Sequence, residues 1–565
     1  MTESTSMRAR LVGAGFLAPA VVYLMIFFVV PLFQLFWGSV TDNGGSLSPV
    51  HYQRFFSVPV FVRLLGTTLL CALVVAGFSA VLGYPVVRFV AGQPASRRRW
   101  LMLLIILPLW SSFMARTFGW IVILGYHGAL NDFLLRIGLI SHPVHFLYNR
   151  GAVLLGMTHS LLPIFMLNVL PVMLAISPVL PRAAMTLGAG AGTALWRLVL
   201  PLSAPGFSAG FLLVFMAASS FFIVPELLGG AGDILMPQLI IAEVEQTLNW
   251  HFAACLCVIM IVATFVCYGG LSRLFSFFPP RAGGGVERVL SVLGHGSDRV
   301  IERLGGLCRF LPGMFSGAVF VFLFLPILIL VSISFTSGDL LDWPPKGLSL
   351  RWYRTVLHDP LWVTAAWRSL RVAVISALIA TAIGSLAAVG LARLSRRQAA
   401  VIMFVLMAPL VTPHIAIGVS LYRFFSGWGM IGSDMAIVLG HVIGSIPYCV
   451  MSLSASFRYY DPQYDRAAAT LGAPAYKRFF RIILPLVMPG LLAAFLFAFT
   501  LSFDELTVAL FVTGGMKTTL PKQMWDSAVL SVDPSLAVVS TLLLGVNATM
   551  ALVATALSRQ QRPAG

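Results

Sequence analysis

Charged side chains are scarce in this sequence of 565 residues. They make up 10% of the chain, whereas apolar residues make up 59% and the mean hydropathy is +0.92. A water-soluble domain needs polar and charged groups to cover its surface, so this composition excludes one. Lipid must therefore be the main solvent around the protein.

The sequence also lacks the signatures of catalysis. Its nearest approach to a phosphate-binding loop, Gly-Gly-Met-Lys-Thr at 514–518, does not have the spacing of a Walker A motif. It contains no paired acids, nucleophile with a base, or cofactor fingerprint, so we expect neither an enzyme nor a bound cofactor. The six cysteines have no spacing that indicates a disulfide framework or a zinc site. We expect them to be packing residues and expect no metal.

Long apolar runs are what the sequence has in place of these motifs. A hydrocarbon core about 30 Å thick is crossed by roughly 20 helical residues, and helices satisfy their backbone hydrogen bonds within lipid. The runs predict an all-α integral membrane protein with about twelve transmembrane helices. The first run follows Arg8 and Arg10, but it is too long for a signal peptide, and we expect it to be retained. The expected spans are 11–37, 64–90, 100–124, 151–177, 203–228, 252–277, 311–335, 369–394, 399–424, 434–457, 486–512 and 534–558.

The chain repeats itself once. The first copy reads Arg-Ala-Ala at 182–184, Leu-Gly-Ala at 187–189 and Leu-Pro-Leu at 200–202, and the second reads the same at 466–468, 471–473 and 484–486. This duplication predicts two homologous six-helix halves, residues 1–278 and 310–565, joined by a cytoplasmic linker at 279–309. Two halves in the same orientation should pack around a pseudo-two-fold axis along the membrane normal.

Basic residues decide the expected orientation. Lys and Arg number 37 against 20 Asp and Glu, and most of them fall in loops on the same side as the N-terminus. By the positive-inside rule, both termini and the loops 178–202 and 458–485 should be cytoplasmic, and 226–250 and 336–368 periplasmic. A nucleic-acid site would need a folded basic surface outside the membrane. No loop is long enough to supply one, so we expect no nucleic-acid partner.

The repeated segments lie in the two predicted cytoplasmic loops. Their alanines favour a short helix, the glycine permits a tight turn that a side chain would block, and the proline ends the segment before the next membrane helix. Such a helix-turn-helix can dock in a groove on another protein. The alternative is an ordinary amphipathic loop.

These loops resemble the EAA coupling loop of ATP-binding-cassette importer permeases, E-A-A-x3-G-x9-I-x-L-P. Both copies carry Arg where the family has Glu. Asp465, one residue earlier, is a partial substitute in the second half, and the first half has no acid nearby in the sequence. The matching residues, with Asp465, are Arg182, Ala183, Ala184 and Gly188 in the first half and Arg466, Ala467, Ala468 and Gly472 in the second.

The resemblance implies the fold of a type I importer permease in the bacterial inner membrane. It also implies two copies of a separate ATPase subunit that hydrolyses ATP, a periplasmic solute-binding protein and a small-molecule substrate. The resemblance sharpens toward the spermidine/putrescine permeases, which implies a polyamine, although permeases of this lineage for ferric iron, thiamine or phosphonates remain alternatives. The motifs that carry it are at 110–112, 116–117, 120, 128–131, 225–230, 349–353, 503–505, 519–521 and 540–543.

Acidic residues near the outer ends of the fifth helices are candidates for a cation path. Ionisable groups within a membrane bundle are costly and usually functional, and nearby tryptophans can add cation–π contacts. The alternative is that Arg116, Arg368 or Arg371 neutralises these acids in salt bridges. The predicted path residues are Trp110, Arg116, Trp120, Glu226, Asp504 and Glu505.

A secondary transporter of the major facilitator type is the alternative class. It also has twelve helices and a cytoplasmic central loop. It predicts a basic signature after the second helix of each half. The arginines at 97–99 and 396–397 match it only in part, because the accompanying Gly and Asp are absent. It gives no reason for the repeated Ala-Ala, Gly and Leu-Pro loops.

Overall fold

The computed structural model describes residues 2–42, 44–276, 285–306, 310–459, 462–515, 517–530 and 533–559. Residues 279–284 and 307–309 of the predicted linker, with Cys308, lie outside these ranges. Within the described ranges, regular structure is helical apart from three isolated β-bridges. The all-α prediction is confirmed.

Helices α1 to α14 occupy the predicted first half, and α15 lies in the predicted linker. Two π-helical turns, Met25–Val29 and Leu195–Val199, join α1 to α2 and α10 to α11. The bounds are α1 Thr2–Leu24, α2 Val30–Ser39, α3 Val50–Ser57, α4 Pro59–Ala91, α5 Ala95–Ile106, α6 Phe113–Leu124, α7 Ala129–Arg136, α8 Arg150–Ala175, α9 Val179–Thr186, α10 Ala191–Ala194, α11 Leu200–Ser219, α12 Ile223–Leu228, α13 Met236–Glu245, α14 Trp250–Ser276 and α15 Gly285–Leu304.

Helices α16 to α28 occupy the predicted second half. A π-helical turn at Phe479–Ile483 joins α24 to α25, as in the first half. The bounds are α16 Leu311–Ile333, α17 Arg351–His358, α18 Pro360–Leu391, α19 Arg396–Leu406, α20 Ala408–Val411, α21 His414–Gly427, α22 Asp434–Tyr459, α23 Pro462–Thr470, α24 Ala475–Arg478, α25 Leu484–Phe503, α26 Thr507–Val512, α27 Leu520–Leu530 and α28 Ser535–Arg559.

Ten helices in the described part of the chain are long and apolar enough to span a membrane. The protein is therefore a multi-pass membrane protein. Two of the twelve expected spans are not among the ten. The span 399–424 is divided into α19, α20 and α21, and the last is α28, whose described apolar part is the shorter Ser535–Met550.

The third helix of each half is interrupted, although 100–124 and 399–424 were expected to be continuous. In the first half α5 ends at Ile106, and a 3-10 turn containing Pro108 leads to Ser112, whose side chain caps α6. In the second half Thr412 is extended ahead of Pro413, and α21 starts after it. Proline removes a backbone donor and disfavours helical geometry in the residue before it, so these breaks follow from prolines inside apolar runs.

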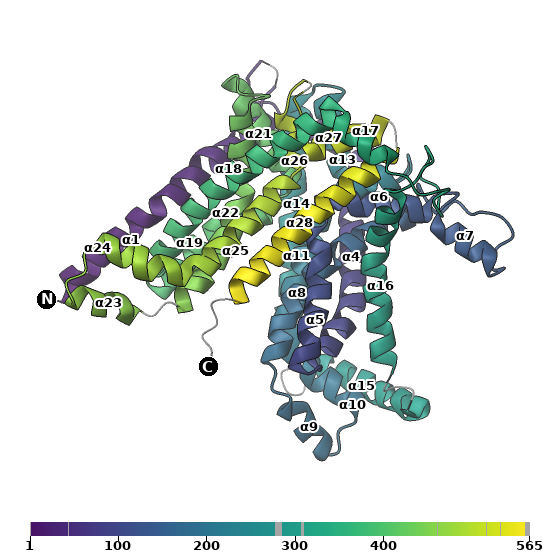
Figure 1. Cartoon of the computed structure of the whole chain (residues 1–565), viewed down its shortest axis with the longest axis horizontal. Coiled ribbons are helices and arrows are strands. Elements are labelled where there is room, and N and C mark those ends of the chain that lie inside the picture. The colour runs from purple at the N-terminus through teal and green to yellow at the C-terminus, as the bar shows by residue number, and fades with distance from the viewer. Residues whose placement is uncertain are drawn as a thin grey trace.

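Each half forms a helix bundle, and one apolar core extends through both bundles. Helices α4, α8 and α11 pack together in the first half, and α18, α22 and α25 pack together in the second. The halves exchange their first helices, because α1 packs on α18 and α16 packs on α6 and α4 (Figure 1). Buried side chains of both bundles form one apolar cluster, which includes Cys71, Cys255, Cys257 and Cys449.

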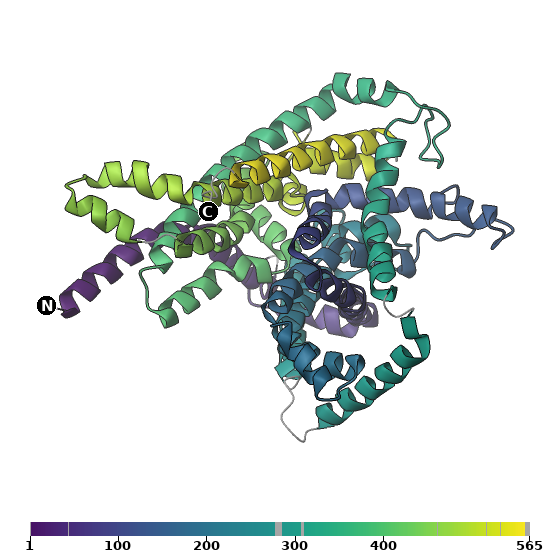
Figure 2. The same cartoon turned by 60° about the horizontal axis from the view of Figure 1, so that its bottom comes forward.

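The two bundles diverge toward one side of the molecule (Figures 1 and 2). That side carries α9 and α10 at the end of one bundle, and α23 and α24 at the end of the other. Helices α13, α17 and α27 lie on the opposite side. The predicted coupling loops therefore share one side, and the loops predicted to be periplasmic share the other.

Candidate coupling loops and translocation path

Both repeated loops form a short helix that ends at a glycine. Helix α9 ends with Gly188 N donating to Met185 O at 3.1 Å, and Ala189 N donating to Ala184 O at 3.1 Å. The second loop repeats this ending after α23, where Gly472 N donates to Ala469 O at 3.0 Å. The two loops are therefore copies of one structure, as the sequence repeat predicts.

Each of these glycines has a left-handed backbone. The φ angle is +89° at Gly188 and +78° at Gly472. Apart from its chain neighbours, no described heavy atom lies within 4 Å of where a Cβ would stand at either position. The expected reason for the glycine was that a side chain would block the turn. The surrounding space is open, so the block comes from the positive φ, which brings a Cβ too close to the following carbonyl oxygen.

Apolar side chains project from both loops. Leu187 is 88% exposed and Leu471 is 87% exposed, each directly before its glycine. Ala183, Arg182 and Arg466 are also exposed. The two leucines are therefore exposed at matched positions of the two loops.

Each loop has an acidic residue against it, but the two acids make different contacts. In the second loop Asp465 Oδ1 lies 3.4 Å from Arg478 Nε and links α23 to α24. In the first loop the acid is Asp298 of α15, which accepts hydrogen bonds from Gly192 and Thr193 at the start of α10. Sequence reasoning found Asp465 and missed Asp298, because Asp298 is remote in the chain.

Asp504 joins the two halves at the predicted path. It follows the end of α25, and its Oδ2 accepts a hydrogen bond from Phe113 N at 3.3 Å. Phe113 is the first residue of α6, the helix that the proline break creates. A helix N-terminus favours a negative charge, so the break in the third helix positions the Asp504 carboxylate.

Glu505 is held by its own half. Val508 N donates to both of its carboxylate oxygens, at 2.9 and 3.0 Å, at the start of α26. His441 Nε2 of α22 lies 3.2 Å from Oε2, and its Nδ1 shares a hydrogen bond with Ser502 Oγ at 2.7 Å. Sequence reasoning missed His441, whose only signal was a polar residue in an apolar span.

The first half has no acid at the positions that match Asp504 and Glu505. The alignment of Gly188 with Gly472 places Ser220 and Phe221 there. The Phe221 ring packs edge-on against Phe113 at 5.3 Å. The negative charge at the junction therefore comes from the second half alone.

Trp110 and Trp120 serve mainly as packing groups, whereas the charge of the buried Arg116 acts on Asp504. Arg116 is 1% exposed, and its Nη1 donates to Ser160 O at 3.2 Å. Trp120 is buried against the rings of His159 and Phe322, each 5.5 Å away. Trp110 packs against Phe497 and accepts a hydrogen bond from Asn547 through its carbonyl. Neither tryptophan forms a cage around the acids.

Glu226 belongs to a separate acidic group on the α13 and α27 side. It accepts a hydrogen bond from Gln238 Nε2 at 2.6 Å. Its charge acts on Glu245 together with that of Asp526, and Lys522 opposes them. Burial raises the pKa of Glu245, and the two acids raise it further. Lys522 also forms an ion pair with Asp526, so this group of acids is partly neutralised.

Of the three arginines proposed to neutralise the path acids, Arg116 acts on Asp504 through its charge, and the other two have different partners. Arg368 Nε donates to Asp434 Oδ1 at 2.6 Å, and its Nη2 donates to Gly432 O at 2.7 Å. Arg371 lies 3.8 Å from Asp434 Oδ2. Arg368 and Arg371 therefore do not form salt bridges with Asp504 or Glu505 in this conformation, and that part of the interpretation is wrong.

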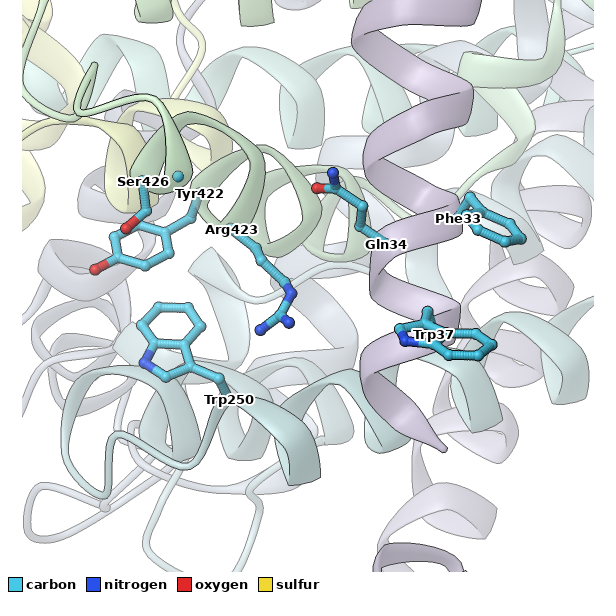
Figure 3. Close-up of a pocket in the computed structure, with 8 residues that line it drawn as sticks. Phe33, Gln34, Trp37, Trp250, Tyr422, Arg423 and Ser426 are labelled. Carbon is cyan, nitrogen blue, oxygen red and sulfur yellow. The ribbon is translucent and has the colours of Figure 1, made fainter. Parts of the chain in front are cut away.

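A surface cavity of about 700 Å³ lies apart from these residues, between α2, α14 and α21. The Trp250 and Tyr422 rings stack 4.1 Å apart at one side of it. Figure 3 shows the Arg423 guanidinium pointing into the space between Trp250 and Trp37. Its lining includes none of the predicted path residues.

Comparison with known proteins identifies the family. Residues 380–563 match the family described as binding-protein-dependent transport system inner membrane component. The putrescine transport system permease protein PotI of Escherichia coli K12 is 37% identical over 243 residues, which is 42% of this chain and 86% of that protein. The spermidine/putrescine permease protein PotC of the same strain is 31% identical over 254 residues, 45% of this chain and 96% of that protein.

A third relative and one solved structure also match parts of the chain. The spermidine/putrescine permease protein PotB of Salmonella typhimurium is 31% identical over 229 residues, 40% of this chain and 79% of that protein. A crystal structure of a bacterial transporter that imports alginate overlaps 46% of this chain and 94% of its own, with a TM-score of 0.39 and 18% identity. The protein sequences, each matched over most of its length, show that this chain belongs to the family of binding-protein-dependent ABC importer permeases.

Proposed function

We propose that this chain is a two-half permease in which residues 1–278 and 310–565 each supply one half of the translocation path. The observation that carries the proposal is the pair of matched loops, which end on the same side with the same glycine turn and the same exposed leucine. Each relative is matched over most of its length by less than half of this chain. A duplicated chain of this kind does the work of two separate subunits.

The two loops are the docking sites for two ATPase copies in the cytoplasm. Their exposed apolar residues suit a groove on another protein, and the positive-inside rule assigns this side to the cytoplasm. A solute-binding protein would then dock over α13, α17 and α27. The divergence of the bundles toward the loops supports a path that opens to the cytoplasm in this conformation.

The substrate proposed is a polyamine cation. The relatives are named for putrescine and spermidine/putrescine. Acids at two levels of the proposed path suit a cation, although Lys522 pairs with Asp526 and the charge of Arg116 acts on Asp504. Glu226, Glu245 and Asp526 lie at the mouth, and Asp504 lies at the junction of the halves. Glu505 stabilises the start of α26 in this scheme, because its carboxylate already accepts a hydrogen bond from Val508 N and pairs with His441. Phosphonate is an anion, so these acidic residues would repel it.

Reconstitution tests the function. The purified chain, its ATPase and its binding protein are placed in liposomes, and uptake of labelled spermidine and putrescine is followed with and without ATP. We expect ATP-dependent uptake that requires the binding protein, with an ATPase-dead variant as control. Uptake of ferric iron or thiamine with no competition by polyamines would contradict the substrate. Uptake driven by an ion gradient without ATP would contradict the importer.

A further inference from the structure

The linker helix α15 packs directly on the first coupling loop (Figure 1). Leu290 of α15 is 3% exposed, and a Cβ at Gly294 would stand 3.0 Å from Thr193 Cα in α10. An approach this close requires a glycine on the face of α15 that meets α10. The segment expected to be a simple connection therefore contains a helix that is fitted to the loop.

Asp298 of α15 caps the start of α10. Its Oδ1 accepts a hydrogen bond from Gly192 N at 2.6 Å, and its Oδ2 accepts from Thr193 N at 3.2 Å and from Thr193 Oγ1 at 2.6 Å. Helix α10 continues into α11, so these donors are the free N–H groups of a membrane-spanning helix. A carboxylate there satisfies the donors and faces the positive end of the helix dipole.

Two further contacts fix the angle of α15. Trp196 Nε1 donates to Ser297 Oγ at 2.9 Å, and Arg197 Nη2 donates to Glu287 Oε1 at 2.7 Å. These partners lie on α15 about three turns apart, and Asp298 lies next to Ser297. Contacts spread along the helix hold it in one orientation across the loop.

The second loop cannot accept such a helix. Where the first loop has Gly190 and Gly192, the aligned positions of the second hold Pro474 and Tyr476. A Cβ at Gly190 or Gly192 would clash with Asp298 or Ser297, at 2.2 and 2.6 Å. The glycines of the first loop are therefore what admits α15, and the two loops of this chain are built differently.

We propose that α15 is a positioning element for the first coupling loop, in which Asp298 supplies the acid that the loop itself lacks. The inference rests on the proposed function of the loops as ATPase docking sites. Helix α15 holds the N-terminal end of α10 in place, and α9 is held in turn through the short connection at 187–190. Engagement of the ATPase at the first loop then depends on the linker, whereas the second loop depends on its own Asp465.

Site-specific cross-linking of the assembled transporter tests the proposal. Leu187→Cys reports ATPase contact at the first loop and Leu471→Cys reports it at the second, each in a variant without other cysteines. Asp298→Ala should lower cross-linking at Leu187→Cys by about 3- to 30-fold, the range for loss of a helix cap. Asp298→Asn, which keeps an accepting oxygen, should restore most of it. Cross-linking at Leu471→Cys should stay unchanged, which also shows that the variant is folded and inserted.

A matched control and a second variant complete the test. Glu302→Gln removes one negative charge from the exposed face of α15 and should leave both cross-links unchanged. Gly192→Leu should act like Asp298→Ala, because its side chain displaces Ser297. Equal loss at both loops, or no loss at Leu187→Cys with Asp298→Ala, would overturn the proposal. Absence of both cross-links in the otherwise unaltered transporter would instead overturn the docking function itself.

Discussion

Replacing the two loop glycines with alanine separates backbone strain from steric blocking. Gly188 and Gly472 have φ angles of +89° and +78° in open space. A left-handed conformation costs a non-glycine residue about 1–2 kcal/mol. At about 1.4 kcal/mol for each factor of ten, each alanine should reduce the population of the docking turn about 5- to 30-fold.

The assay is ATPase activity stimulated by the loaded binding protein, measured in liposomes. Gly188→Ala and Gly472→Ala should each lower it several-fold while insertion is unchanged, and Trp at these positions should add little further loss. Gly188→Asn is the control, because asparagine tolerates the left-handed region. Full activity in the double alanine variant would refute the reasoning, as would a large loss with Trp and none with Ala.

Three further predictions concern the path, the topology and the linker. Asp504→Asn should raise the half-saturating substrate concentration about tenfold, since a charged hydrogen-bond partner is lost. Glu505→Gln should instead lower the thermal stability of the α26 turn. Unchanged transport in both variants would remove the acids from the path. An impermeant thiol reagent should label Leu187→Cys and Leu471→Cys only from the cytoplasm, and labelling in intact cells would overturn the orientation. The hydrogen bonds of Asp298 outweigh its burial and lower its pKa. Its contribution is therefore present above the ordinary value of about 3.9 and is lost only as the pH falls through the lower folded value. Because thiol reactivity itself falls with pH, the measurement is the ratio of first-loop to second-loop cross-linking, which should be equal at about pH 8 and pH 5; a fall in that ratio at pH 5 would contradict this.

Local patterns predicted the coupling loops well. The Leu-Gly-Ala repeat gave both turns, and their matched hydrogen bonds follow from residues close in the chain. The positive φ at both glycines agrees with the expected tight turn, but a sequence pattern does not separate open space with positive φ from a crowded turn.

Long-range contacts could not be predicted in the same way. Asp298 meets Gly192 and Thr193 across more than a hundred residues, and the linker composition gave no sign of the pairing. His441 meets Glu505 for the same kind of reason. The interruptions of the third helices were missed because hydropathy stays high across Pro108 and Pro413, where the regular α-helix ends. Proline alone does not mark such a break, since Pro85 lies inside the continuous helix α4.

The central claim is that one chain supplies both ATPase docking sites. Native mass measurement of the purified, detergent-solubilised transporter tests it directly, because the permease has a mass of 61.2 kDa. The account predicts one permease chain with two ATPase copies, falling to one copy when either loop is disrupted. A complex with two permease chains and two ATPase copies would contradict it.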